Sequence, residues 1–465
     1  MTRRPYDIVL IIADAYRQDS AQRASAESAG SPFFGKLRPF YWFPRCFSSA
    51  PWTLPSCSSI LSGVDSSRHG YFLHGRAFGL PTIGHHLKGD FHRAAVVNNG
   101  NLRTFTGFQE DFDEYHYLSG HQNPFDKARD VLKAGGSGKP LFLFFHTNIP
   151  HDYYLKYSRE YYETYFPGRE DWFYMAARVL SWNGLSPQQR VTVRSFYDAS
   201  TRNMEERLGA LLEVLDLERT IVCFVADHGE GFDYDLARVH HGGRLHDDLL
   251  RVPLLIRLPE GADRNVHDRL AAAQESGCSS TDIVPTLLEL AGYEVPSGID
   301  GSTLLAAGKA GRRLVSEDRR YLYKPNRERL NVNSTGKNTT FWTRLKNRVL
   351  KRTLLRGFNV KSYVRYPHKL IVTSLATSRL VPRPVMSFFL DGLFMSKDQL
   401  QHVGNVVLSL ELFDLEKDPG ETHNLLRDLP GDRLRDPIGD RIGGLSDLEI
   451  TVGGQRVALE ASLPS

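Results

Sequence analysis

The stretch SSAPWTLPSCSSILSG, from Ser48 to Gly63, decides how the rest of the chain is interpreted. It places Thr53 two residues ahead of a proline and three ahead of Ser56. A hydroxyl that is bound to a metal ion loses its proton more easily and becomes an alkoxide nucleophile. A lone threonine is far more often structural, so this role depends on which residues the fold brings to Thr53.

The composition is that of a large globular protein. With 465 residues, of which 41% are hydrophobic, the chain can bury a sizeable core, and we expect one large domain with an appendage. Its four cysteines are scattered, with neither metal-ligand spacing nor a disulfide framework. The sequence MTRRP leads directly into an apolar run, without a signal peptide of ordinary length or a segment that could span a bilayer, which predicts a cytoplasmic enzyme.

Five apolar runs predict buried strands. The stretch Val191–Leu215 between two of them has apolar residues at helical spacing. Alternating strands and helices over about 300 residues predict an α/β fold, in which a large, mostly parallel or mixed sheet is covered by helices on both faces. The five runs are IVLII (8–12), AAVV (94–97), LFLFF (141–145), TIVCFVA (220–226) and PLLIRL (253–258).

Polar residues stand where three of these strands end. Asp14 follows the first strand, His146 follows 141–145, and Asp227 and His228 follow 220–226. Functional loops of such sheets lie at the carboxyl ends of the strands. An adjacent carboxylate and imidazole ahead of a glycine suit a divalent cation with mixed oxygen and nitrogen ligands. The alternatives are a capping Asp227 beside an exposed His228, and a capping or turn role for Asp14.

A series of motifs then identifies a family. IVLIIADAYRQD, APWTLPSCSSILSG…RHG, FFHTNIPH, FVADHGEGF and HHGGRLHDDLLRVPLLIR occur in this order, followed by SSTDIVPTLLELAG, DGSTLL and, near the end, ELFDLEKDPGETHNLL. With them the chain resembles the sulfatase-like branch of the alkaline-phosphatase superfamily over about three-quarters of its length. The resemblance implies an alkaline-phosphatase-like fold and a hydrolase that acts on phosphoric or sulfuric esters.

The resemblance also implies a metal centre. Asp14, Asp227 and His228 would bind one divalent ion (manganese, zinc or calcium), together with Thr53 as the nucleophile. A second metal ion is compatible with the sequence, without a ligand set that the sequence assigns. The candidate contributors are Asp19, Glu230, His146 and His240.

Histidines complete the implied site. His151 matches a histidine near the substrate that can donate a proton to the leaving group, and His241 matches a position that contacts substrate oxygens. His146 is a further candidate for the pocket. The alternatives are a surface-loop position for His151 and a solvated turn for His240 and His241.

Two departures from the sulfatase pattern point toward phosphate chemistry. Sulfatases place at the position of Thr53 a Cys or Ser that is oxidised to formylglycine, and an Arg at the position of Cys57. Many also carry a second aspartate where this chain has Ala15. Cys57 cannot itself be modified in this way, because Ser59 stands where a Pro or Ala is needed. The set resembles the phosphotransferases and phosphodiesterases of the superfamily, which use a threonine alkoxide with manganese or zinc.

We therefore expect in-line attack by Thr53 on phosphorus and hydrolysis of phosphate or phosphonate esters. Three alternatives stay open. One is a transferase that moves a phospho-headgroup onto a glycan or lipid, and another is a sulfatase that uses Thr53 unmodified. The third is a catalytically degenerate relative that binds an anionic ligand.

The C-terminal part differs in composition. We expect a catalytic domain over residues 1–310, a smaller α+β subdomain over 311–430, and a tail over 431–465 whose Gly, Asp and Arg content predicts partial disorder. Strand-like pieces in the subdomain are Lys369–Thr373, Pro384–Leu390 and Leu408–Leu412.

The subdomain is also strongly basic. From Arg319 to Lys369 there are fifteen Lys or Arg residues and one acid, Glu328. Phe341–Phe358 has the pattern of a basic amphipathic helix, which could bind an anionic membrane surface or a polyanion, or pack its apolar stripe on the core. No nucleic-acid-binding module is recognisable, and the sequence leaves the oligomeric state open.

Overall fold

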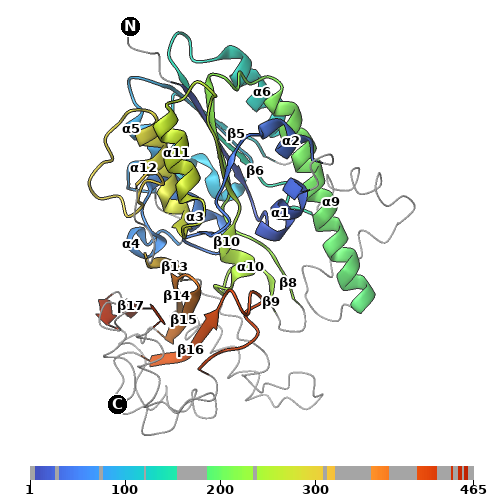
Figure 1. Ribbon diagram of the computed structural model, residues 1–465, viewed down its shortest axis with the longest axis vertical. Helices are drawn as coiled ribbons and strands as arrows, with labels where there is room; N and C mark the ends of the chain where they lie inside the picture. Colours follow the sequence, from blue (N-terminus) through green and yellow to red (C-terminus); the bar gives the residue numbers. More distant parts are fainter. Residues whose placement is uncertain are drawn as a thin grey trace. The chain divides into compact units, whose positions relative to one another are not determined.

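The structure is a computed structural model, and it describes residues 6–26, 31–72, 77–119, 122–153, 186–233, 238–306, 312–319, 358–375, 406–426, 441–442, 449–452 and 455–458. The chain forms two compact units (Figure 1). The first comprises Met1–Tyr234, Val239–His241 and Asp248–Ala310, and the second comprises Asp235–Arg238, Gly242–Asp247 and Gly311–Ser465.

A seven-stranded sheet forms the centre of the first unit. Strand β11 is antiparallel to β7 and β2, and the other neighbouring pairs are parallel, which confirms the predicted mostly parallel sheet. The strands, in their order across the sheet, are β2 (Tyr41–Trp42), β11 (Leu254–Arg257), β7 (Thr220–Ala226), β1 (Asp7–Ala13), β6 (Leu141–Thr147), β4 (His92–Val97) and β5 (Glu114–Tyr117).

The central strands are buried on both of their faces. Every residue of β6 and β7 is buried, and so is β1 beyond its first residue. Continuous runs of Val, Ile, Leu and Phe suit such strands because both faces of a parallel sheet are covered. The apolar runs of the sequence therefore predicted their positions well.

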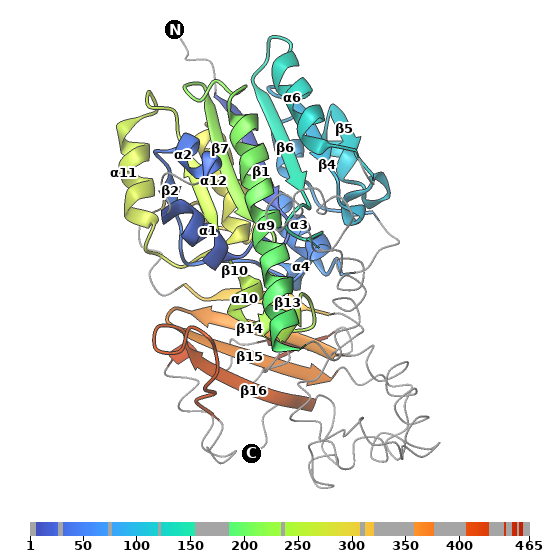
Figure 2. The same ribbon diagram turned by 90° about the vertical axis from the view of Figure 1, so that its right-hand side faces the viewer.

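Helices cover the two faces of this sheet (Figures 1 and 2). The helix predicted over Val191–Leu215 begins earlier, because Ser186 and Gln189 form a capping box and Pro187 favours the first turn, and it ends at Leu212. One face carries α1 (Gln18–Ala26), α2 (Pro32–Leu37), α6 (Pro124–Ala134) and α9 (Pro187–Leu212); the other carries α3 (Thr53–Ser62), α5 (Ile83–His86), α11 (Arg264–Ala273) and α12 (Ile283–Leu290).

Shorter elements connect these layers. A three-stranded sheet contains β10 (Arg251–Val252), β3 (Cys46–Phe47) and β12 (Cys278–Ser279), and β8 (Gly231–Asp233) pairs with β9 (Arg238–His240). The remaining helices are α4 (Ser66–His69), α10 (Asp247–Leu250) and the 3-10 turns η1 (Gly100–Leu102), η2 (Thr104–Thr106), η3 (Phe108–Asp111) and η4 (Ser280–Asp282). Among the helices of the described ranges, none is long and apolar enough to cross a membrane.

The second unit contains an antiparallel sheet of β13 (Leu314–Asp318), β14 (Phe358–Arg365), β15 (His368–Leu375) and β16 (Val406–Asp414). The predicted strands Lys369–Thr373 and Leu408–Leu412 lie within β15 and β16, whereas Pro384–Leu390 lies outside the described residues. Within the segment 431–465, β17 (Glu449–Val452) and β18 (Gln455–Ala458) form a hairpin.

The basic segment is described only in part. Residues 341–357 of the predicted amphipathic helix lie outside the described residues, and Phe358 is the first residue of β14 rather than the end of a helix. Lys369 is fully buried, with its Nζ 2.7 Å from Oδ1 of Asp247 and 2.9 Å from Oε1 of Glu421. Part of the positive charge of the segment is therefore paired inside the second unit.

Candidate active site and metal centre

The predicted site residues of the first unit gather at the carboxyl edge of its sheet. Asp14 follows β1, His146 is the second-to-last residue of β6, and Asp227 follows β7. In the ladder, Ile12 is level with His146 and Ala13 with Ala226, so the three strand ends lie side by side. The parallel register brings these residues together, as their positions at the ends of predicted strands suggested.

Asp14, Asp227 and His228 form a compact, fully buried group. Each offers a ligand atom, and these atoms lie within 4.8 Å of one another. Nε2 of His228 is 3.3 Å from Oδ1 of Asp14 and 3.6 Å from Oδ2 of Asp227. Oδ1 of Asp14 is buried and accepts no hydrogen bond. Two buried carboxylates, one with an oxygen that accepts no hydrogen bond, and an imidazole fit a divalent cation, which would offset the negative charge.

Backbone amides fix the orientation of Asp227. Its Oδ1 accepts hydrogen bonds from the amides of Ala15 (3.1 Å) and His228 (2.8 Å), which leaves Oδ2 for other partners. Ala15 has a φ of 58°, a left-handed conformation that is rare for a residue with a side chain. The hydroxyl of Tyr197 donates to the carbonyl of Ala15 (2.8 Å) and helps to hold this turn. Such strain is typical of functional sites.

Thr53 is the first residue of α3 and is almost completely buried. Its Oγ1 lies 3.3 Å from Oδ2 of Asp14 and 3.4 Å from Nε2 of His228. The N-terminal end of a helix favours negative charge, so the position suits both an alkoxide and an anionic substrate. The helix ends at Gly63, whose φ is 70° and where a Cβ atom would lie 2.7 Å from Cγ2 of Ile299.

The predicted catalytic histidines lie beside this group. The ring of His241 is between two others, with centroid distances of 4.9 Å to His151 and 4.6 Å to His228. Nδ1 of His151 is 2.8 Å from Oδ1 of Asp152, and Nδ1 of His241 is 3.1 Å from Oε2 of Glu230. A carboxylate therefore orients each of the two catalytic candidates.

The two histidines differ in protonation. Burial disfavours a charged imidazole, yet Asp14 and Asp152 raise the pKa of His151 to about 10. Burial lowers the pKa of His241 to about 3, and the nearby Glu230 carboxylate offsets only part of this effect. A protonated and a neutral imidazole side by side suit an acid and a base.

The two carboxylates also differ. Burial opposes ionisation of Asp14, but His151 and His228 hold its pKa well below the usual range. Burial and the neighbouring Asp14 raise the pKa of Asp227 to about 7. Burial opposes a charge on His228 as well, and Asp227 and Asp14 nevertheless raise its pKa. The pKa values of these three buried groups are all shifted because their charges lie close together. Such a cluster is typical of a functional site, and here it suits a set of metal ligands.

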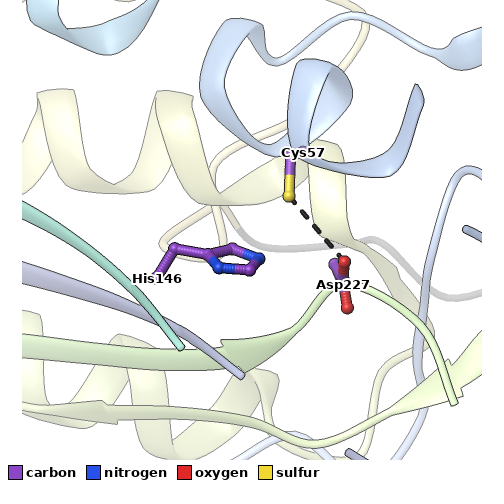
Figure 3. Close-up of side chains that lie close together, drawn as sticks. All are labelled: Cys57, His146 and Asp227. Atoms are coloured by element: carbon purple, nitrogen blue, oxygen red, sulfur yellow. Dashed lines mark hydrogen bonds between the residues drawn. The ribbon is translucent and has the colours of Figure 1, made fainter. Parts of the chain in front are cut away.

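A second group of side chains shares Asp227 (Figure 3). Sγ of Cys57 lies 3.8 Å from Oδ2 of Asp227, and the ring of His146 extends toward these two side chains. His146 is fully buried, and neither of its ring nitrogens has a hydrogen-bond partner. Nε2 of His146 is 3.7 Å from Oδ2 of Asp14. Burial lowers the pKa of His146 to about 4 and raises that of the Cys57 thiol.

The structure separates the candidates for a second metal. Of the four, only His146 belongs to a potential ligand group within the described part of the chain. Asp19 is partly exposed and bonded to Arg17 (2.8 Å). Glu230 pairs with His241, and His240 ends β9 with a φ of 59°.

Sequence reasoning missed Asn99 and Asp152 near the site, and it named Cys57 only as the replacement of an arginine. Nδ2 of Asn99 donates to Oδ2 of Asp14 (2.5 Å), Asp152 orients His151, and Cys57 approaches Asp227. Asn99 follows β4 closely, so the strand-end argument that found Asp14 could have found it. Asp152 is adjacent to His151 in sequence, but only the fold shows which way its carboxylate faces.

Known proteins match a large part of this chain. A family model described as Sulfatase matches residues 6–293. The chain belongs to the sulfatase family. This confirms the resemblance that the motifs predicted, and with it the alkaline-phosphatase-like fold.

Individual sulfatase relatives are distant. An uncharacterized sulfatase of Escherichia coli K12, YidJ, is 24% identical over 333 residues, which cover 68% of this chain and 53% of YidJ. The chain spans about half the length, or less, of the curated relatives it matches. A 2-O glycosaminoglycan sulfatase is 14% identical with a TM-score of 0.60, covering 91% of this chain and 88% of that one.

A second solved structure matches equally well. The phosphonate monoester hydrolase of Agrobacterium radiobacter is 16% identical with a TM-score of 0.59, and the match covers 92% of both chains. At these identities the likeness concerns the fold alone. The chemistry of this sulfatase-family chain must therefore be argued from its own residues.

Proposed function

We propose that this sulfatase-family chain is a metal-dependent hydrolase that cleaves phosphate or phosphonate esters, with Thr53 as the nucleophile. The observation that carries the proposal is the position of Oγ1 of Thr53 at the start of α3, 3.3 Å from Asp14 and 3.4 Å from His228. No Cys or Ser stands there to become formylglycine, so sulfate esters are the less favoured substrates.

The proposed metal ligands are Asp14, Asp227, His228 and Thr53. The candidate ions are manganese, zinc and calcium, because the donors are oxygen and nitrogen. When bound, such an ion acts as a Lewis acid and lowers the pKa of the Thr53 hydroxyl. The carboxylates supply the negative charge that retains the ion in a buried position.

Thr53 begins the reaction. The Thr53 hydroxyl releases its proton to solvent, and its Oγ1 forms a bond to phosphorus while the bond from phosphorus to the leaving oxygen breaks, giving a covalent phosphothreonyl enzyme. Asp152 holds Nδ1 of His151, so Nε2 of that imidazolium donates a proton to the leaving oxygen. The raised pKa of His151 keeps this acid protonated at neutral pH.

His241 serves the second half of the reaction. Burial opposes the charge on Glu230, yet His241 lowers the pKa of Glu230 to about 2, so its carboxylate only accepts hydrogen bonds. Nδ1 of the neutral His241 is therefore the donor, and its Nε2 carries a lone pair. That nitrogen accepts a hydrogen bond from the water that attacks phosphorus and releases Thr53. The proton of this water passes to His151, which the first step left without its own. An acceptor alcohol in place of this water would make the enzyme a transferase.

The test compares ester classes across metals. Metal-free protein is supplied with Mn²⁺, Zn²⁺ or Ca²⁺ and assayed with p-nitrophenyl phosphate, bis-p-nitrophenyl phosphate, a phenylphosphonate ester and p-nitrophenyl sulfate. We expect turnover of the phosphorus esters, a loss of at least about a thousandfold in Thr53→Ala, and partial activity in Thr53→Ser, which keeps a hydroxyl. Mass spectrometry of the peptide that contains Thr53 should detect the phosphothreonyl species.

The other outcomes separate the alternatives. Turnover of the sulfate alone would contradict the phosphate assignment, and full activity of Thr53→Ala would remove the nucleophile assignment. Phosphothreonine that forms but is released only by an added alcohol identifies a transferase. No turnover and no phosphothreonine in any metal form would favour an anion-binding relative without catalysis.

A further inference from the structure

We infer that Cys57, His146 and Asp227 form a second metal site, which shares Asp227 with the first and takes Zn²⁺ or a cation of similar softness. The inference deepens the proposed function, since Asp227 serves both sites, but it does not require Thr53 to be the nucleophile. It rests on the geometry of the three side chains and on the buried imidazole of His146, which makes no hydrogen bond.

The three side chains converge from separate elements (Figure 3). Cys57 comes from α3, His146 from β6, and Asp227 from the end of β7. Each is buried and offers one ligand atom, and the three atoms lie within 4.8 Å of one another. Tetrahedral zinc with sulfur and oxygen ligands holds them about 3.6 Å apart. The observed distance from Sγ of Cys57 to Oδ2 of Asp227 is 3.8 Å.

His146 points independently to a ligand. Its ring is fully buried, and both of its nitrogens lack a hydrogen bond. Leaving a buried polar group without a hydrogen bond is unfavourable, so such groups are normally satisfied. The ring extends toward Cys57 and Asp227 (Figure 3). A metal ion bound to one nitrogen would satisfy it.

The donor set selects the class of ion. Sulfur and imidazole ligands favour zinc and other soft or borderline cations, whereas calcium, magnesium and manganese prefer oxygen. The first group, with Asp14, Asp227, His228 and Thr53, offers no sulfur. The two sites therefore differ in chemistry, and a thiolate-specific signal belongs to the second alone.

Charge and protons balance on binding. The Cys57 thiol faces Oδ2 of Asp227, where its hydrogen is directed. As the bond from sulfur to the metal forms, this proton leaves to solvent, and the metal takes its place between sulfur and carboxylate. Asp227 can serve both sites because the same Oδ2 is 3.6 Å from Nε2 of His228 and 3.8 Å from Sγ of Cys57. Paired sites of this kind occur in enzymes that cleave phosphate esters.

The test uses cobalt(II) as the probe. The full chain is stripped with chelator and titrated with Co²⁺, while thiolate-to-cobalt charge transfer is followed in the near ultraviolet and bound metal is counted by mass spectrometry. We expect about two equivalents and a charge-transfer band. Cys57→Ala and Cys57→Ser should each bind one equivalent less and lose the band, and His146→Ala should weaken it. Asp14→Asn should lose the other equivalent and keep the band.

Controls make the outcome decisive. Cys223→Ala removes another buried cysteine, in β7, and should leave the band unchanged. Circular dichroism and urea unfolding check that each variant folds, and the two Cys57 variants decide the matter if His146→Ala does not. Absence of the band from the wild type, or a band that survives in both Cys57 variants, overturns the second site.

The experiments distinguish failure of the second metal site from failure of the proposed function. Thr53-dependent ester hydrolysis with one bound metal and no band would keep the proposed function and reject the second site. Two equivalents with a Cys57-dependent band, in a protein that hydrolyses none of the esters, would do the reverse.

Discussion

Nδ1 of His151 lies 2.8 Å from Oδ1 of Asp152, and the other oxygen of this carboxylate accepts a hydrogen bond from the side-chain amide of Asn148. Asn148 in turn accepts from the side-chain amide of Asn98, which follows β4. The chain of hydrogen bonds fixes the orientation of the imidazole ring through Nδ1. Asp152 therefore acts on the reaction through His151.

Replacing Asp152 by Asn should lower the fraction of His151 that carries its proton at a given pH. Asp152 is one of the groups that raise the pKa of His151, so the variant's imidazole loses its proton at lower pH. We expect the alkaline fall in kcat/KM to move to lower pH. Esters with poor leaving groups should lose more rate than p-nitrophenyl esters, because they need the proton, and the loss should stay below the roughly 10²–10⁴-fold that a complete general acid contributes.

Asp126→Asn is the matched control for this variant. Asp126 is exposed on α6 and pairs with Arg129 on the surface. Its pH profile should equal that of the wild type. Equal losses for good and poor leaving groups in Asp152→Asn would show that Asp152 has only a structural role.

Metal removal should lower thermal stability. Asp14 and Asp227 are buried together, and a bound cation offsets their charge only in the folded protein. A metal ion present at a hundred times its Kd raises the free energy of unfolding by about 2.7 kcal/mol. We expect Tm to fall on addition of chelator and to recover with Zn²⁺ or Mn²⁺. In Asp14→Asn the difference between the chelated and metal-supplied forms should shrink, and an unchanged difference would place the metal elsewhere.

The sequence predicts the framework of the site better than its details. Asp14 and Asp227 were predictable because apolar runs locate β1 and β7, and a parallel sheet brings their ends together. Thr53 has no such signal, since a threonine at a helix start is common, and only the family motif singled it out. The direction of a side chain depends on packing from distant elements. For this reason the sequence could not predict that the carboxylate of Asp152 points toward His151.

The surroundings of Cys57 and Lys369 could not be predicted from the sequence either. A single cysteine between serines carries no metal signal, and its approach to Asp227 arises because α3 packs beside the end of β7. Lys369 is one of fifteen cations in a segment whose pattern favours solvent or a polyanion. Its burial depends on acids that lie over a hundred residues before it and some fifty after it in the sequence.

Gly229 should tolerate no side chain. It follows His228, and a Cβ atom added there would lie 2.0 Å from the carbonyl oxygen of Asp248, a backbone atom that cannot move aside freely. We expect Gly229→Ala to destabilise the protein by roughly 3 kcal/mol or more. Gly79→Ala is the control, because that position has no atom within 4 Å, and its effect should stay within about 1 kcal/mol. Urea unfolding of both variants measures the difference, and similar stabilities would contradict the close approach.

Lys369→Met should destabilise the second unit strongly. The substitution keeps the length of the side chain but leaves the carboxylates of Asp247 and Glu421 buried without the ammonium group that lies 2.7 Å and 2.9 Å from them. Breaking a buried ion pair on one side costs about 3–5 kcal/mol. Burial also raises the pKa of Glu421, so lowering the pH protonates this acid first and should reduce the loss of stability.

Lys417→Met is the control, because it removes an exposed cation that pairs with Asp414 and should change the free energy of unfolding by less than about 1 kcal/mol. Urea unfolding at neutral and mildly acidic pH measures both variants. A loss in Lys369→Met that is no larger than that of Lys417→Met, or that grows as the pH falls, would contradict the buried pairing.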